Sequence, residues 1–175
     1  GLQVLEKQPL VGYLPQGSTN DFAASLKIPS DPAKAAEAIV RGETRQLDIG
    51  CFDERIFVYV ASFGAFTKVS YAASQGMKNA LGHCGYLVEG IRDLSTLRPY
   101  RVRITADGER LDGNYLFGAV ANSTSIAGMM KLDGEQVVLD DGRFELLLVP
   151  NPKNAAELQN LILALLNQQY DAGGL

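Results

Sequence analysis

The sequence predicts an α+β fold that is mostly β, an antiparallel two-layer β-sandwich with inserted helices. Residues 100–105 alternate polar and apolar side chains, as a half-buried strand does. Asp107-Gly108 follows as a strong hairpin-turn signal, and residues 115–121 predict the returning strand. Apolar residues recur at three- and four-residue spacing within residues 64–97 and 154–169, which predicts two amphipathic helical regions. Antiparallel strands interrupted by helices give the predicted class.

The N-terminal stretch predicts a strand, a turn and a short helix. The apolar run at residues 10–14 is typical of a short buried strand. Pro15 lacks a backbone N–H and Gly17 tolerates unusual dihedral angles, so the strand is expected to end there. Residues 18–21 (STND) are of the types that cap helices, and residues 22–26 predict the helix itself. Such an arrangement offers free backbone amides to a phosphate, but many α/β turns of this kind bind nothing.

A second helix is expected to begin at Pro32, with Asp31 as its N-cap, and to end at Gly42. Its core-facing stripe would consist of Ala33, Ala36, Ile39 and Val40. Residues 44–49 and 55–63 then predict two strands of a hairpin.

Composition excludes several classes of function. The 175 residues carry 16 basic and 20 acidic side chains, so the net charge is −4 and no overall basic field attracts nucleic acid. No apolar run approaches the roughly 18 residues of a membrane-spanning helix. Two cysteines are too few for a disulfide framework, which favours a cytoplasmic location. His83, the only histidine, has no partner motif for metal binding or nucleophilic catalysis.

Five motifs, in order along the chain, resemble those of the diacylglycerol kinase and related bacterial lipid kinase family. They are PQGSTNDFA at residues 15–23, GETRQLDIG at 42–50, FVYVASFG at 57–64, NSTSIAG at 122–128 and LDDGRF at 139–144. The first resembles the family pattern P-x-G-[ST]-x-N-D-[FL]-A. The resemblance extends over about 130 residues, which is far more specific than any one turn.

The resemblance implies a particular domain organisation. Residues 1–42 would be the end of an α/β nucleotide-binding domain and its junction, and residues 43–175 an incomplete β-sandwich lipid-kinase domain. The family's glycine-rich G-G-D-G-[TS] loop does not occur in this sequence. Its catalytic base, a glutamate in a D-G-E segment, would lie beyond Leu175, because the similar sequence at residues 132–135 precedes the DDG hairpin. The chain by itself is therefore expected to be inactive.

The resemblance also implies the chemistry of the parent enzyme. It would use ATP and Mg²⁺ to phosphorylate a lipid hydroxyl, with conversion of diacylglycerol to phosphatidic acid as the first expectation. Phosphatidylglycerol, sphingoid bases and polyprenols stay open as acceptors, because an acyl pocket needs only an apolar lining. Asp21 would be the acidic catalytic-site residue at the cleft, serving the metal or the polar network near the acceptor. The nucleotide-binding residues would be Gly17, Ser18, Thr19 and Asn20.

The sequence DDG at residues 140–142 has two interpretations. By itself it is a common tight turn, between strands predicted at residues 136–139 and 144–149. In the family this hairpin holds a structural Mg²⁺. That role would fall to Asp141 with backbone carbonyls near Val138 and Arg143, the hard oxygen ligands that Mg²⁺ prefers.

The partners implied are a lipid substrate and a membrane surface to which the protein attaches peripherally, and a homodimer through an exposed sheet edge is compatible with the pattern. Lys68, Lys78, Arg92 and Arg98 are candidates for a basic lipid-facing patch, although ordinary solvated side chains explain them more simply. Residues 122–125 (NSTS) either contact a ligand or satisfy backbone groups at a strand end, and the pattern favours neither.

Two alternatives remain open from the sequence. The family often has arginine where this chain has Ala24, which leaves room for a non-catalytic binding or regulatory β-sandwich. NAD kinase shares the superfamily architecture, but its motif typically reads N-E, whereas this chain has Asn20-Asp21.

Overall fold

The computed structural model describes residues 10–17, 19–65, 98–126, 130–132, 134–135 and 137–169. These residues form two compact units, the first from residues within 1–61 and 121–145 and the second from residues within 62–120 and 146–175. The long helical region predicted within residues 64–97 lies outside the described residues after Ala65, as do Lys68, Lys78, Arg92 and His83. The predicted domain border at residue 42 stays a prediction.

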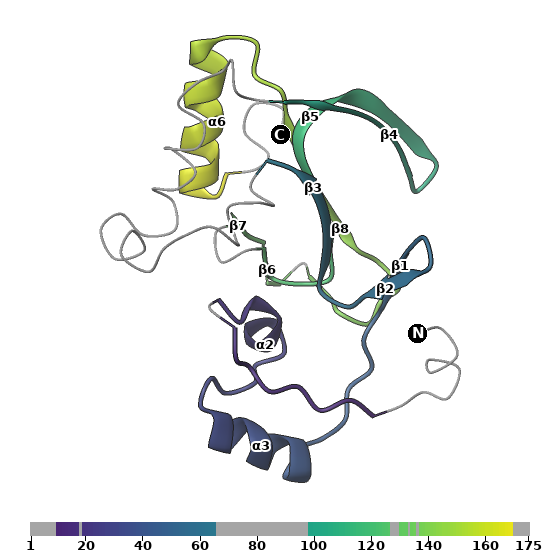
Figure 1. Ribbon diagram of the computed structural model, residues 1–175, viewed down its shortest axis with the longest axis vertical. Coiled ribbons are helices and arrows are strands. Elements are labelled where there is room, and N and C mark those ends of the chain that lie inside the picture. Colours follow the sequence, from purple (N-terminus) through teal and green to yellow (C-terminus); the bar gives the residue numbers. More distant parts are fainter. Residues whose placement is uncertain are drawn as a thin grey trace. The chain divides into compact units, whose positions relative to one another are not determined.

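In the described part of the chain, the first unit contains two short helices and two small hairpins (Figure 1). In chain order its elements are α2 (Asp21–Ser25), α3 (Pro32–Arg41), β1 (Gly50–Phe52), β2 (Arg55–Phe57), β6 (Ser125–Ile126) and β7 (Met130–Lys131). Strand β1 pairs antiparallel with β2, and β6 pairs antiparallel with β7. The buried apolar side chains here include Ala23, Ala35, Ile126 and Met130.

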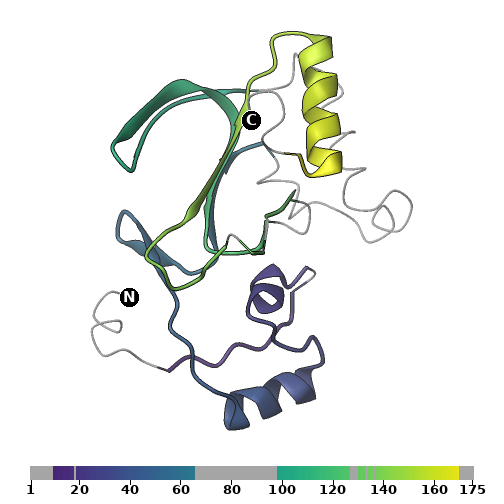
Figure 2. The same ribbon diagram turned by 180° about the vertical axis from the view of Figure 1, so that it is seen from behind.

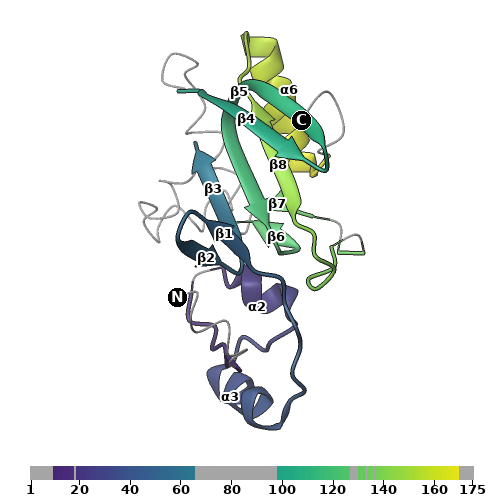
Figure 3. The same cartoon turned by 90° about the vertical axis from the view of Figure 1, so that its right-hand side faces the viewer.

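The second unit is built around a four-stranded sheet. Its strands are β3 (Val60–Gly64), β4 (Tyr100–Ala106), β5 (Glu109–Ala121) and β8 (Glu145–Pro150), of which β3 and β8 begin, and β5 ends, at residues of the first unit. Strand β5 pairs with all three others, and the side view of Figure 3 shows it with β3 on one side and β8 on the other. Four consecutive residues of β5, from Leu116 to Ala119, are buried, because this half of the strand has neighbours on both sides.

The predicted strand at residues 100–105 and the Asp107-Gly108 turn are confirmed, but β5 begins at Glu109 rather than at residue 115. Tyr100 pairs with Tyr115 and Ala106 with Glu109, and the turn residues Asp107 and Gly108 have φ of 50° and 86°. Positive φ at both positions is what a type I′ turn requires, and it explains why Asp-Gly is favoured there. The turn end of this ribbon projects away from β3 (Figures 1 and 2).

Helix α6 (Ala155–Asn167) confirms the predicted C-terminal helix. Asn154 caps it by accepting a 2.9 Å hydrogen bond from the Glu157 amide, and Glu157 accepts a 2.7 Å bond from the Lys153 amide. Leu158 and Leu161 are buried as expected, since they recur on one face.

Helix α3 has the predicted limits but not the predicted stripe. Asp31 accepts a 2.9 Å bond from the Lys34 amide, Pro32 opens the helix and Gly42 ends it. Of its apolar residues only Ala35 is buried. The predicted stripe Ala33, Ala36, Ile39 and Val40 is exposed. Periodicity identifies an apolar face, but what covers that face is decided by tertiary packing.

Three strand predictions are wrong. Residues 10–14 form no strand, and Leu10 and Val11 are each more than 80% exposed. Residues 44–49 form no strand, so the hairpin consists only of β1 and β2, with Asp53-Glu54 as its turn. Residues 137–139 form no strand either, and the DDG sequence is a turn rather than a hairpin. A strand needs a neighbour to take its backbone hydrogen bonds, and apolar patterning does not supply one. The fold class itself is confirmed: the chain is mostly β with antiparallel sheets and few helices.

Candidate functional site

The loop before α2 is closed by the side chain of Asn20. This residue is the N-cap and has a left-handed φ of 51°, but its side chain does not cap the helix. Its Oδ1 instead accepts a 2.7 Å hydrogen bond from the Gly17 amide. Gly17 and Thr19 are exposed, whereas Ser18 lies outside the described residues. The Gly17 amide is thus occupied, and the five-residue α2 offers only a short run of aligned peptide dipoles.

Asp21 is the buried carboxylate of this site. Its side chain comes from the first turn of α2, and the residue is 7% exposed. Oδ1 accepts a 2.6 Å hydrogen bond from the Ser125 hydroxyl, and Oδ2 accepts a 3.1 Å bond from the Tyr59 hydroxyl. Phe22 packs against Tyr59, with the ring centroids 6.3 Å apart. Two hydroxyl donors fix the carboxylate, and a buried carboxylate needs such partners.

Ser25 links α2 to the segment that follows β5. Its hydroxyl lies 2.8 Å from the Ser123 hydroxyl and 3.1 Å from the Thr124 hydroxyl, and it accepts a 3.1 Å bond from the Thr124 amide. Ser123 is fully buried, and its hydroxyl donates to the Ser125 carbonyl at 2.8 Å. Of the two readings of residues 122–125, satisfaction of backbone groups is therefore the one that the contacts support.

Asn122 holds together the loop that precedes β1 and the DDG turn. The residue is 1% exposed, and its Nδ2 donates 3.0 Å bonds to the carbonyls of Asp48 and Leu139. Its own amide donates to the Tyr59 carbonyl at 2.9 Å. A carboxamide suits this place because its NH₂ carries two donors for two carbonyls.

Two carboxylates flank the DDG turn. Asp48 accepts a 2.6 Å bond from the Gly142 amide, and Asp141 accepts a 3.0 Å bond from the Arg143 amide. Gly142 has a φ of 77°, the left-handed conformation that glycine adopts at no steric cost. The turn therefore carries acidic oxygen at its surface.

Glu145 follows this turn at the start of β8. Burial raises the pKa of its carboxyl above the usual range, its own backbone amide lowers it, and the nearby Asp141 raises it. Its Oε2 is buried with no hydrogen-bond partner among the described residues. Both facts favour the protonated form of this side chain near the turn.

Sequence reasoning located Asp21 and Asp141 and named Ser125 within residues 122–125, but it missed three side chains that act with them. Asp48 and Tyr59 lie inside the GETRQLDIG and FVYVASFG motifs, so a signal for both was present. Glu145 lies outside the motifs, and its importance comes from its burial near the DDG turn. Ala24, where the family often has arginine, is exposed, and both oxygens of Asp21 have partners without it.

The comparisons with known proteins all find diacylglycerol kinases. The model of the diacylglycerol kinase catalytic domain matches residues 1–52. A diacylglycerol kinase of Bacillus subtilis (strain 168) is 34% identical over 166 residues, which cover 94% of this chain and 54% of that protein. The chain is similar to this diacylglycerol kinase over nearly its whole length.

Further relatives extend the comparison. A diacylglycerol kinase of Staphylococcus carnosus (strain TM300) is 35% identical over 93% of this chain and 52% of its own length. A solved structure from Bacillus anthracis str. Sterne shares the fold with a TM-score of 0.64 and 23% identity, over 90% of this chain and 50% of that one. A diacylglycerol kinase structure from the same organism gives a TM-score of 0.57, over 93% of this chain and 49% of that one. The chain spans about half the length of the curated relatives it matches, and the family resemblance seen in its motifs is confirmed.

No helix among the described residues is both long and apolar enough to cross a membrane.

Proposed function

We propose that this chain is part of an ATP-dependent lipid kinase that phosphorylates diacylglycerol to phosphatidic acid. The observation that carries the proposal is Asp21, a buried carboxylate in the family's N-D-F motif, held at both oxygens by Tyr59 and Ser125. The names of the curated relatives supply the substrate class.

In this proposal the residues of the chain hold the reacting groups in place. Phosphoryl transfer breaks the bond between the β,γ-bridging oxygen and the γ-phosphorus of ATP, joins the phosphorus to the lipid oxygen and releases the hydroxyl proton. Asp21 fixes the polar network beside the acceptor, with Tyr59 and Ser125 as positioning residues. We assign nucleotide binding to Gly17, Ser18, Thr19 and Asn20.

A divalent cation fits the DDG turn chemically. Asp141 would bind Mg²⁺ with backbone carbonyls near Val138 and Arg143, and water would fill the remaining positions. No cluster of three acidic, histidine or cysteine side chains that could hold a metal exists in the described part of the chain, so one carboxylate must work with carbonyl oxygens. The ion would supply fixed positive charge that stabilises the turn.

The test of function is transfer of labelled phosphate from ATP to diacylglycerol in mixed micelles by the full-length gene product. Asp21→Asn should reduce transfer by 10²-fold or more, because it removes the charge while nearly preserving the shape. Asp53→Asn is the matched control, since Asp53 is exposed in the β1–β2 turn. A folded wild-type protein that phosphorylates no diacylglycerol refutes the proposed acceptor, and unchanged transfer by Asp21→Asn refutes the role of Asp21.

The metal assignment has its own readout in the stability of the chain. Mg²⁺ should raise the unfolding midpoint of the wild-type chain, because a ligand that binds only the folded state stabilises it. Asp141→Asn should lose that response, whereas Asp53→Asn should keep it.

A further inference from the structure

One face of the β4–β5 ribbon gathers basic side chains. Residues directly opposite in an antiparallel pair lie on the same face. This face consists of Arg101, Arg103 and Thr105 from β4 and Arg110, Asp112 and Asn114 from β5. Its net charge is +2, in a chain whose overall charge is −4. We refer to these six residues as the arginine face.

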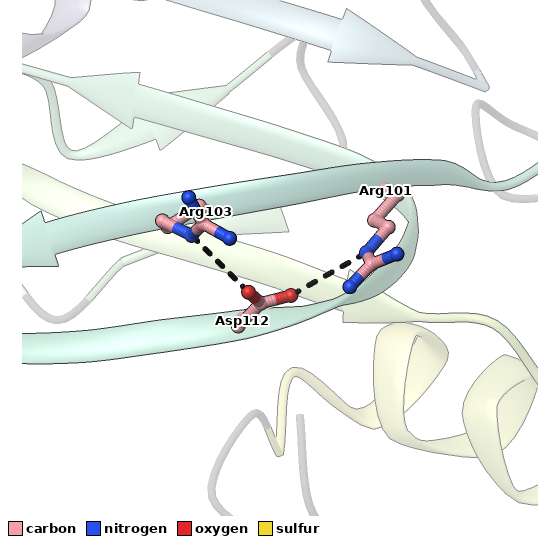
Figure 4. A network of polar contacts seen from close by, with 3 residues as sticks. All are labelled: Arg101, Arg103 and Asp112. Atoms are coloured by element: carbon pink, nitrogen blue, oxygen red, sulfur yellow. Dashed lines mark hydrogen bonds and ion pairs between the residues drawn. The ribbon is translucent and has the colours of Figure 1, made fainter.

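A single carboxylate holds two of the arginines side by side (Figure 4). Oδ2 of Asp112 accepts a 3.2 Å hydrogen bond from Nε of Arg103, and its Oδ1 lies 3.7 Å from Nε of Arg101. Both contacts use Nε, so the Nη groups of both guanidinium forks have no hydrogen-bond partner among the described residues. The two side chains are 60% and 79% exposed, and Arg110 is exposed as well.

We propose that the arginine face binds the phosphate groups of an anionic lipid surface. The outer edge of a guanidinium presents paired N–H donors that match two phosphate oxygens. Arg101 and Arg103 are two residues apart on one strand, which places their backbones about 7 Å apart and allows each to engage a separate headgroup. The assignment to a lipid surface rests on the proposed function, because the acceptor of a lipid kinase is presented in a membrane.

The charge of the chain agrees with a membrane rather than a nucleic acid as the partner. The negative charge of the whole chain disfavours the extended contacts that a long polyanion makes. A small basic face is sufficient for headgroups that lie within a Debye length of it.

The test is co-sedimentation of the full chain with vesicles at low ionic strength, without diacylglycerol or ATP. The wild type should bind vesicles of phosphatidylcholine and phosphatidylglycerol but not pure phosphatidylcholine, and added salt should weaken the binding. Each arginine removed should weaken binding about fivefold, so R101Q/R103Q/R110Q should bind on the order of 100-fold more weakly. The control K34Q/R45Q/K153Q removes three exposed positive charges elsewhere and should bind nearly as well as the wild type.

Two further variants keep the test decisive if the triple glutamine variant fails to fold. Substituting lysine at the same three positions keeps the charge and should retain most of the binding. Asp112→Asn removes the acidic member of the face and should strengthen binding up to about fivefold. Folding of every variant is checked by circular dichroism.

Three outcomes overturn the proposal. They are no preference of the wild type for anionic vesicles, an equal loss of binding in the control variant, and Asp112→Asn binding no more tightly than the wild type. The first of these outcomes includes binding of single-stranded RNA or an acidic peptide without binding of anionic vesicles. Because the assay contains neither nucleotide nor acceptor, its failure is distinct from failure of the kinase proposal, which is measured in neutral detergent micelles.

Discussion

Asn122→Asp tests the reasoning about the site most directly, because it replaces a carboxamide that donates two hydrogen bonds by a carboxylate of nearly the same shape. The Asn122 side chain is fully buried and donates to the carbonyls of Asp48 and Leu139. An aspartate has nearly the same shape, but its ionised oxygen would face those two carbonyl oxygens. The substitution therefore replaces two attractions by two repulsions.

The expected cost follows from these contacts. Loss of two hydrogen bonds costs about 2 kcal/mol net, and leaving a buried charge without a partner brings the total to about 3–5 kcal/mol. For a chain of this size the melting temperature should fall by about 6–20 °C. Burial and the two carbonyls should raise the pKa of the new carboxyl. The cost is therefore greatest at neutral pH and shrinks as the pH falls through that pKa, since the protonated acid regains one donor.

The assay is urea unfolding followed by far-ultraviolet circular dichroism at pH 7 and again near pH 4, with each variant compared with the wild type at the same pH. Asn114→Asp is the matched control, because Asn114 is exposed on β5 and the change should alter stability by less than about 0.5 kcal/mol. A cost below about 1 kcal/mol for Asn122→Asp at pH 7 would refute the role of Asn122. A cost of the same size at both pH values would refute the electrostatic part of the reasoning.

Three further predictions concern single residues. Glu145→Gln should stabilise the chain at neutral pH, as measured by urea unfolding. The Glu145 carboxyl has a raised pKa in the folded state, so the wild-type chain is most stable at low pH and loses stability as the pH rises through that pKa. The stability gained by Glu145→Gln should therefore vanish below the usual pKa of glutamate. Gly64→Ala should lower the free energy of unfolding by at least about 2 kcal/mol, because φ is 92° and the new Cβ would overlap the Leu116 carbonyl oxygen. Gly108→Ala is the control: φ is 86° but the space is open, so the loss should be only about 1 kcal/mol. Equal losses in the two variants would contradict this reasoning. Asp31→Ala should destabilise α3 by about 1 kcal/mol through loss of its N-cap, seen as faster hydrogen exchange in α3 but not in α6.

Local signals in the sequence predicted the elements whose limits depend on neighbouring residues. Asp31 and Pro32 start α3, and Asp107-Gly108 makes the turn of the β4–β5 hairpin, because caps and turns act within about four residues. The expected strand at residues 10–14 failed for the opposite reason, since its apolar pattern required a pairing strand that the pattern does not specify. Exposure of Val40 on α3 has the same cause.

The sequence by itself determined the resemblance to the diacylglycerol kinases, through ordered motifs, and the presence of a carboxylate at Asp21. Only the tertiary structure decided what surrounds that carboxylate. Tyr59 and Ser125 are 38 and 104 positions away from it in the chain, and no local pattern relates residues at such separations. Folding brings these residues together at α2, where the hydroxyls of Tyr59 and Ser125 supply the hydrogen-bond donors that a buried carboxylate needs.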